Sequence, residues 1–216
     1  MSISIDKVAD ALSEEGYIVI PYALDVDVLR GLQQRVGSLS SEQWLSAGVG
    51  RNTSYQQNKK IRSDKIFWVS KDDPQESAFL QDMELLRQGL NQSLYMGLFD
   101  FESHFATYPK GAYYQKHVDA LRGRSNRVLS VILYLNEGWL AEDGGELLMY
   151  SDHQQEHREG HQEEPIQRVV PELGTMVVFL SEKFPHEVLE SHRQRYSLTG
   201  WFRINSSQSG RVDPAS

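Results

Sequence analysis

The fold of this chain is decided by the stretch GAYYQKHVDALRGRSNRVLSVILYLNEG, residues 111–138. Two runs within it, 112–118 and 127–135, have the two-residue period of β-strands and are separated by a break that contains Gly and Asn. Apolar residues before residue 101 mostly recur with helical spacing, and from residue 101 the period falls to two. The change of period predicts helical support followed by a β-core.

The β-core is predicted to contain eight short strands. They cover roughly residues 101–108, 112–118, 127–135, 145–150, 166–170, 175–180, 186–190 and 195–204. Regular short strands with Gly-, Pro- and Asn-rich breaks are typical of a sandwich or barrel. We therefore predict a mainly β fold with supporting N-terminal helices, a double-stranded β-helix (jelly roll, cupin-like) with helices covering one sheet.

The first hundred residues are predicted to supply that support. The expected elements are a helix over 5–12, a strand over 16–20, a helix from the cap Asp25 to about Val36 with Gly37 as its stop, a strand over 66–69 and a helix over 76–96. We expect one domain over 1–206, with support in 1–100 and core in 101–204, and a flexible tail over 207–216.

Two polar segments interrupt this plan. Residues 46–64 contain Gly48 and Gly50 and are either a solvated connection or a mobile loop that gates a substrate. Residues 151–165 carry His153, His157 and His161 at a spacing that could bind a metal on one helix face. An exposed insertion between strands is favoured for 151–165, because no apolar stripe would dock such a helix.

Composition excludes several classes of function. The chain has no cysteine, which removes disulfides, zinc–thiolate sites and thiol catalysis and suits a reducing cytoplasm. It shows neither a membrane span nor a signal peptide, so we expect no membrane partner. A net charge of −8 argues against a nucleic-acid partner. We expect a cytoplasmic monomer.

Three residues form a candidate metal site. His117 and Asp119 belong to the tripeptide His-Val-Asp, and His186 follows in a later strand. Two imidazoles and one carboxylate can bind one face of Fe(II) and leave the opposite positions open. Because strand positions i and i+2 share a face, His117 and Asp119 can reach one metal. Arg195, nine residues after His186, can hold the far carboxylate of a dicarboxylic cosubstrate as a bidentate pair.

The tripeptide alone is a weak signal, and the order of the surrounding motifs strengthens it. The motifs are TYP (107–109), GAYYQKHVD (111–119), RVLSVILYLN (127–136), GGEL (144–147), FPHEV (184–188) and RYSLTGW (195–201). From about Arg62 to Arg203 this order resembles the prolyl hydroxylases of the 2-oxoglutarate- and iron-dependent dioxygenase superfamily. The specific branch contains the hypoxia-inducible-factor prolyl hydroxylases and their bacterial relatives.

The resemblance implies cofactors and roles for further residues. It implies Fe(II), 2-oxoglutarate and O2, with succinate and CO2 as products and ascorbate as a candidate further cofactor. Arg195 and Tyr134 would bind the distal carboxylate of 2-oxoglutarate, and Thr199 could line the same pocket. The family pattern further assigns Tyr108 near the cofactors and Tyr114, Trp201, Arg127 and Asp64 to the substrate side. Core packing remains the alternative for the aromatic residues, and a surface ion pair remains the alternative for Arg127 with Asp64.

The resemblance also implies a substrate class, a prolyl residue in a protein loop hydroxylated at C4. Elongation factor Tu is the target expected for bacterial relatives, and oxygen sensing is a role known in the branch. Four rivals stay open: a nucleic-acid demethylase, a collagen-type prolyl hydroxylase, a hydroxylase of another residue or small molecule, and a non-catalytic metal-binding sensor. Trp201 replaces the second arginine of the demethylases, and Arg195 replaces the lysine of the collagen type. His104 and His192 are expected to be ordinary polar histidines.

Overall fold

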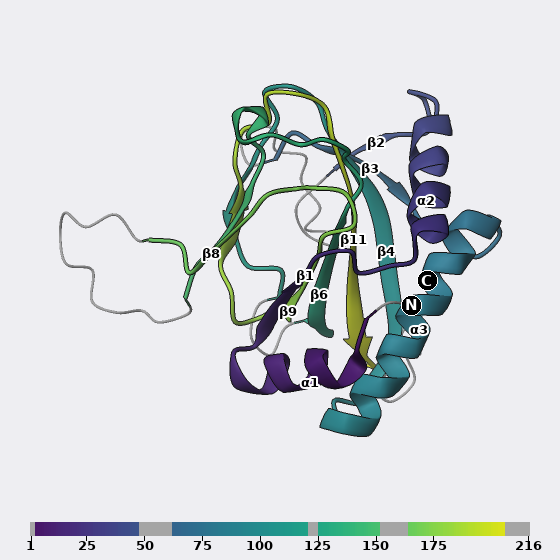
Figure 1. The fold of residues 1–216 in the computed structure, drawn as a ribbon, viewed down its shortest axis with the longest axis vertical. Coiled ribbons are helices and arrows are strands. Elements are labelled where there is room, and N and C mark those ends of the chain that lie inside the picture. Colours follow the sequence, from purple (N-terminus) through teal and green to yellow (C-terminus); the bar gives the residue numbers. More distant parts are fainter. Residues whose placement is uncertain (1–2, 48–61, 121–124, 152–163, 206–216) are drawn as a thin grey trace.

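The computed structural model describes residues 3–47, 62–120, 125–151 and 164–205. Its elements are α1 (Ile5–Glu14), β1 (Tyr17–Ile20), α2 (Val26–Ser38), β2 (Leu45–Ser46), β3 (Lys65–Trp68), α3 (Pro74–Leu94), β4 (Leu98–Tyr108), β5 (Tyr114–His117), β6 (Arg127–Tyr134), the 3₁₀ turn η2 (Ala141–Asp143), β7 (Leu147–Met149), β8 (Gln167–Val169), β9 (Met176–Leu180), β10 (His186–Val188) and β11 (Arg195–Ile204) (Figure 1). Each predicted core strand is present, with ends that differ by at most three residues. The expectations for the loop within 46–64, for the three histidines within 151–165 and for the tail lie outside the described residues.

The strands form two antiparallel sheets that face each other. The larger has seven strands in the order β1-β9-β6-β11-β4-β3-β2, and the smaller has four in the order β5-β10-β7-β8. From β4 onward the chain crosses repeatedly between the sheets, and β11 is inserted between β6 and β4. This is the predicted jelly roll, and β1, β2 and β3 widen its larger sheet.

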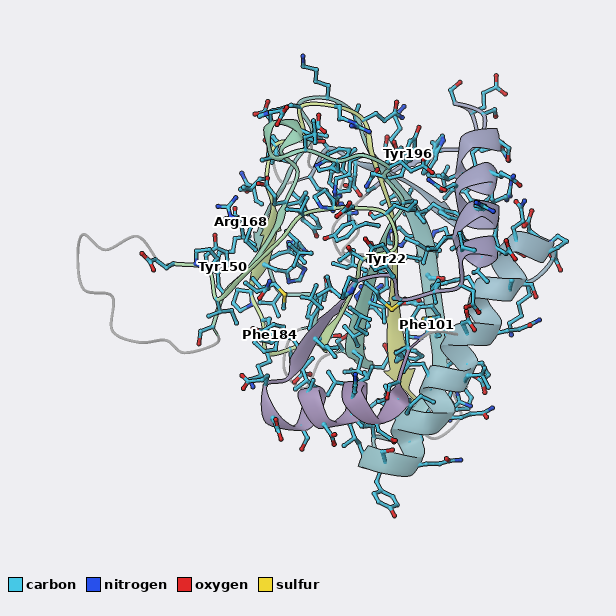
Figure 2. The ribbon with its side chains drawn as sticks, viewed as in Figure 1. Tyr22, Phe101, Tyr150, Arg168, Phe184 and Tyr196 are labelled. Carbon is cyan, nitrogen blue, oxygen red and sulfur yellow. The ribbon has the colours of Figure 1, made fainter. Side chains whose placement is uncertain are left out.

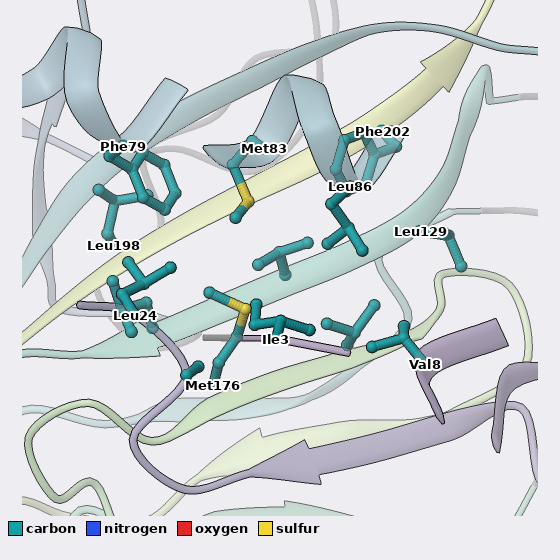
Figure 3. Packing of buried hydrophobic residues seen from close by; sticks show 14 of the residues in the cluster. Ile3, Val8, Leu24, Phe79, Met83, Leu86, Leu129, Met176, Leu198 and Phe202 are labelled. Carbon is teal, nitrogen blue, oxygen red and sulfur yellow. The ribbon is translucent and has the colours of Figure 1, made fainter. Parts of the chain in front are cut away.

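The larger sheet buries apolar side chains on both faces, which explains the dense apolar runs of its strands. One face packs under the helices, where Phe79, Met83 and Leu86 of α3 lie over Leu198 and Phe202 of β11 (Figure 3). The other face belongs to a second cluster that fills the space between the sheets. Its buried members are Ala106, Tyr108, Ala112, Ile132, Tyr134, Leu147, Met149, Val169, Val177, Phe179, Phe184 and Val188. Each large apolar side chain buried in this way contributes about 1.5–3 kcal/mol.

Helix boundaries follow local capping. Asp73 precedes α3 and accepts hydrogen bonds from the backbone N–H groups of Gln75 and Glu76 at 2.9 and 3.1 Å. Helix α3 ends at Leu94, two residues before the predicted Met96, because Tyr95 adopts the left-handed conformation (φ 54°). The predicted stop of α2 at Gly37 is wrong, because the helix continues through Gly37 to Ser38.

Helices and smaller sheet lie on opposite sides of the molecule. In Figure 2, Phe101 lies toward α3, whereas Tyr150 and Arg168 lie on the side away from α2 and α3. None of the helices within the described ranges combines the length and apolarity needed to cross a bilayer.

Candidate active site

The three candidate metal ligands converge at one end of the smaller sheet. His117 is the last residue of β5 and His186 the first of β10, and the strand register places them opposite each other. Asp119 Oδ1 lies 3.5 Å from His117 Nε2 and 3.8 Å from His186 Nε2. Candidate ligand atoms of all three residues lie within 4.8 Å of one another, which suits a single ion. Asp119 follows β5 in a bend, so the expectation that it shares a strand face with His117 is wrong.

Both imidazoles are oriented by the same local contact. His117 Nδ1 lies 2.8 Å from the carbonyl of Gln115, and His186 Nδ1 lies 2.9 Å from the carbonyl of Phe184. Because a carbonyl only accepts hydrogen bonds, each Nδ1 carries a proton and donates it, which leaves the Nε2 lone pair for a metal. Burial, together with the nearby His117, lowers the pKa of His186 to about 4, so His186 is a neutral ligand near pH 7.

The two oxygens of Asp119 have different surroundings. Oδ1 faces the two imidazoles, whereas Oδ2 accepts hydrogen bonds from Ser130 Oγ at 2.6 Å and from the indole Nε1 of Trp201 at 3.0 Å. Ser130 Oγ also lies 2.9 Å from Ser181 Oγ, and because Ser130 donates its single proton to Asp119, Ser181 donates to Ser130. Burial would raise the pKa of Asp119, but His186, His117 and Ser130 outweigh it and hold that pKa far below its usual range.

A second pocket surrounds Arg195, the first residue of β11. Its guanidinium carbon lies 4.7 Å from the ring centroid of Tyr108 and 4.9 Å from that of Tyr134. Arg195 is only 1% exposed, and among the described residues its Nε and Nη1 and the Tyr134 hydroxyl lack a hydrogen-bond partner. Buried donors without partners are rare in folded proteins, and these converge where a carboxylate would satisfy them.

Two glycines let the backbone pass close to this pocket. Gly144 and Gly145 both have positive φ, 64° and 70°. A Cβ at Gly145 would lie 3.1 Å from Cδ of Arg195, and one at Gly144 would lie 2.4 Å from the carbonyl oxygen of Glu190. Side chains at these positions would therefore displace Arg195 or break the local pairing.

Comparison with known proteins agrees with this geometry. The family model of the 2OG-Fe(II) oxygenase superfamily matches residues 103–203. A crystal structure of a Pseudomonas putida prolyl-4-hydroxylase is similar with a TM-score of 0.80 and 37% identity, covering 94% of this chain and 100% of that one. The chain belongs to the 2-oxoglutarate- and iron(II)-dependent oxygenase superfamily.

Two further relatives of this oxygenase are prolyl hydroxylases. One is the prolyl hydroxylase of Trichoplax adhaerens in complex with a peptide fragment of the hypoxia-inducible-factor oxygen degradation domain, with a TM-score of 0.79, 26% identity and coverage of 94% and 93%. The other is the hypoxia-inducible factor prolyl hydroxylase of Caenorhabditis elegans, 25% identical over 94% of this chain. This oxygenase spans only 28% of the length of the C. elegans protein.

The cofactors of the superfamily fit the residues present. Two imidazoles and a carboxylate are a donor set for Fe(II), and their candidate ligand atoms lie within 4.8 Å of one another, close enough to hold one ion. The unpartnered N–H groups of Arg195 and the Tyr134 hydroxyl fit one carboxylate of 2-oxoglutarate. The oxygenase is therefore a prolyl-hydroxylase-like dioxygenase that uses Fe(II), 2-oxoglutarate and O2.

The remaining cofactor and aromatic candidates lie around these two pockets. Tyr114 stacks on the His117 ring with centroids 3.6 Å apart and an interplanar angle of 16°. Thr199 is half-buried on β11, opposite Ile132 of β6 and His104 of β4, on the same strand face as Arg195.

Arg127 and Asp64 do not form the surface ion pair that was the alternative to a role on the substrate side. Asp64 is buried and accepts from Nε and Nη2 of Arg62 at 2.7 and 2.5 Å. Arg127 donates from Nε and Nη2 to Glu102 Oε1 at 3.0 and 2.9 Å. Arg127 and Asp64 thus have different partners, because strand register places Arg127 near β4 rather than near the start of β3.

Several residues of the site were not predicted. Ser130, Ser181, Glu102 and Arg62 all contribute hydrogen bonds around the metal ligands. The sequence did contain a signal for Ser130. It lies four residues before Tyr134 on one strand, and strand alternation places both side chains on the same face.

His104 was expected to be an ordinary polar residue, and the structure differs. It is 4% exposed, its ring lies beside those of Trp68 and Trp201, and Nδ1 has no hydrogen-bond partner among the described residues. Burial, helped by the Arg62 charge, lowers its pKa to about 3, so the ring is neutral. His192 is exposed as expected and contacts the carbonyl of Glu142.

Proposed function

We propose that this dioxygenase hydroxylates C4 of a prolyl residue in an exposed loop of a protein substrate, with succinate and CO2 as the other products. The observation that carries the proposal is the full-length similarity to the Pseudomonas putida prolyl-4-hydroxylase. The relative from Trichoplax adhaerens that binds a peptide supports a protein substrate. Elongation factor Tu is the first candidate, and the absence of cysteine suits action in the reducing cytoplasm.

The chain's residues divide the work between two pockets. Iron with 2-oxoglutarate, when bound, supplies the reductive activation of O2 that hydroxylation of a C–H bond needs. His117, Asp119 and His186 would hold the metal as three ligands and leave coordination positions open for cosubstrate and O2. Arg195 and Tyr134 fix the far carboxylate in a buried pocket, where a charge-assisted bidentate bond is strong. Tyr108 and Thr199 complete the wall on the cosubstrate side.

The substrate side is formed by Tyr114 and Trp201 with Arg127 and Asp64 behind them. Tyr114 and Trp201 touch two different metal ligands, so a ring held between them would lie close to the metal. Arg127 also lines a cavity of about 360 Å³, whose other lining residues are Ser125, Val128, Leu180, Glu182, Lys183 and Ile204. Asp64 acts through Arg62, whose guanidinium lies 4.5 Å from the Tyr114 ring centroid.

Mass spectrometry tests the substrate class directly. Purified protein with Fe(II) and 2-oxoglutarate is added to a cell lysate, and peptides are searched for one added oxygen atom on proline, first in elongation factor Tu. His186→Ala is the matched control, because it lacks one of three metal ligands and should add none. Oxygen found on another residue or on a small molecule contradicts the prolyl assignment. A wild type that binds metal and 2-oxoglutarate but modifies nothing indicates a sensor module instead.

The cosubstrate pocket has its own test. Arg195→Lys keeps the positive charge but loses the planar fork, so it should weaken 2-oxoglutarate binding by roughly 1–3 kcal/mol. Calorimetry with Mn(II) in place of iron measures this without turnover. Arg193→Lys is the control, because Arg193 lies on the surface over Trp139. Unchanged affinity in Arg195→Lys would mean that another group holds the far carboxylate.

A further inference from the structure

The indole of Trp201 contacts two charged residues, the metal ligand Asp119 and Arg127. Its Nε1 donates to Asp119 Oδ2 at 3.0 Å, and the guanidinium carbon of Arg127 lies 3.4 Å from its ring centroid. Trp201 is 6% exposed and has the His104 ring as a second neighbour, with centroids 5.4 Å apart. A guanidinium on an indole face makes a favourable cation–π contact, and the Arg127 side chain is only 19% exposed.

Arg127 is fixed in turn by a buried ion-pair network. Its Nε and Nη2 both bond Glu102 Oε1, and the second oxygen of Glu102 accepts from Nη1 of Arg203 at 3.0 Å. Arg203 also bonds Asp100 through Nε at 2.8 Å. The strand register places Glu102 directly opposite Trp201, so the network and the indole share one face of the larger sheet.

We propose that Arg127 is a positioning residue that acts through Trp201 on Asp119. By holding the indole flat it keeps the N–H on Oδ2, so that Oδ1 alone is presented to the metal between the two histidines. The role deepens the proposed function and rests on its iron site, not on the identity of its substrate. Ser130 holds Oδ2 from the other neighbouring strand, and loss of either donor lets the carboxylate rotate.

Cobalt(II) binding tests the proposal without turnover. We expect Arg127→Met to weaken Co(II) binding roughly 10- to 100-fold and to change the visible absorption of the Co(II) complex. Arg203→Met is the matched control, because Arg203 also bonds Glu102, whereas the cation–π contact with Trp201 is made by Arg127. It should lower the melting temperature while leaving Co(II) affinity and spectrum at wild-type values. Equal affinity in Arg127→Met and wild type overturns the proposal.

The route through Trp201 is tested by a double-mutant cycle. Trp201→Phe keeps a ring but removes the N–H, so it should weaken Co(II) binding about as much as Arg127→Met, again roughly 10- to 100-fold. Adding Arg127→Met to Trp201→Phe should then cause little further loss, because both remove the same hydrogen bond. Independent, additive losses overturn the proposed route.

If Arg127→Met does not fold, Arg127→Lys replaces it. We expect Arg127→Lys to weaken Co(II) binding several-fold, and wild-type affinity in this variant contradicts the proposal. A wild type that binds no Co(II) overturns the metal site and this proposal together, whereas failure to hydroxylate proline leaves the measurement intact.

Discussion

Two stacks of carboxylate, arginine and aromatic ring end on different metal ligands. The first is Asp64–Arg62–Tyr114–His117, and the second is Glu102–Arg127–Trp201–Asp119. In the first, the arginine and its carboxylate are two residues apart and the ring lies flat on the imidazole. In the second, they are 25 residues apart, Glu102 bonds two guanidiniums, and the ring donates a hydrogen bond. The first stack restrains the plane of the His117 ring. The second holds Oδ2 of Asp119, so that Oδ1 faces the two histidines.

The largest expected difference between the stacks is in stability. Glu102→Gln removes the buried charge that the guanidiniums of Arg127 and Arg203 share, so it should lower the free energy of unfolding by about 3 kcal/mol or more. Asp64→Asn removes the charge facing one guanidinium and should cost about 1.5–3 kcal/mol. Urea unfolding of the metal-free proteins measures both. A larger loss of stability in Asp64→Asn than in Glu102→Gln would mean that the Arg62–Asp64 pair stabilises the protein more than the ion pairs of Glu102 do.

Substitutions of Tyr114 and Trp201 test how the two stacks differ in their effect on metal binding. Tyr114→Phe keeps the ring on His117 and should retain metal affinity, whereas Tyr114→Leu removes the stack and should weaken Mn(II) binding roughly 10-fold. For Trp201 even the aromatic replacement Trp201→Phe should be harmful, because the N–H is what reaches Asp119. Calorimetry with Mn(II) separates the two. A loss in Tyr114→Phe equal to that in Tyr114→Leu would assign the effect to the hydroxyl.

A pH-dependent effect is expected at His104, whose pKa is lowered mainly by burial and also by the positive charges of Arg62 and Arg127. The folded protein protonates it only below about pH 3, whereas an unfolded chain does so below pH ~6.5. Unfolding therefore takes up a proton between these values, and stability falls as pH falls through this window, by up to about 1.4 kcal/mol per pH unit. His104→Leu should flatten the dependence, measured by urea unfolding at pH 4.5, 5.5 and 7. An unchanged slope would assign it to other groups.

Local pattern was enough to predict the strands and the ligand set. Alternation and breaks located the eight core strands because these depend on neighbours in the sequence. The partners of Arg127 could not be predicted, because Glu102 meets it only when β11 brings β4 and β6 to its two sides. The conformation of Asp119 could not be predicted either, because β5 ends at His117 and Asp119 lies in the bend that follows. The burial of His104 could not be predicted, because Trp68 and Trp201 lie on two other strands that only the folded sheet places beside it.

The central position of β11 has a consequence for biosynthesis. This strand is the last element of the described chain, yet it fills the gap between β6 and β4 and carries both Trp201 and Arg195. A nascent chain that has not yet released residues 195–204 from the ribosome can pair β6 with β9 but cannot complete either pocket. Iron capture with a correctly held carboxylate therefore waits until translation of the domain is almost finished, and incomplete chains lack the means to use 2-oxoglutarate.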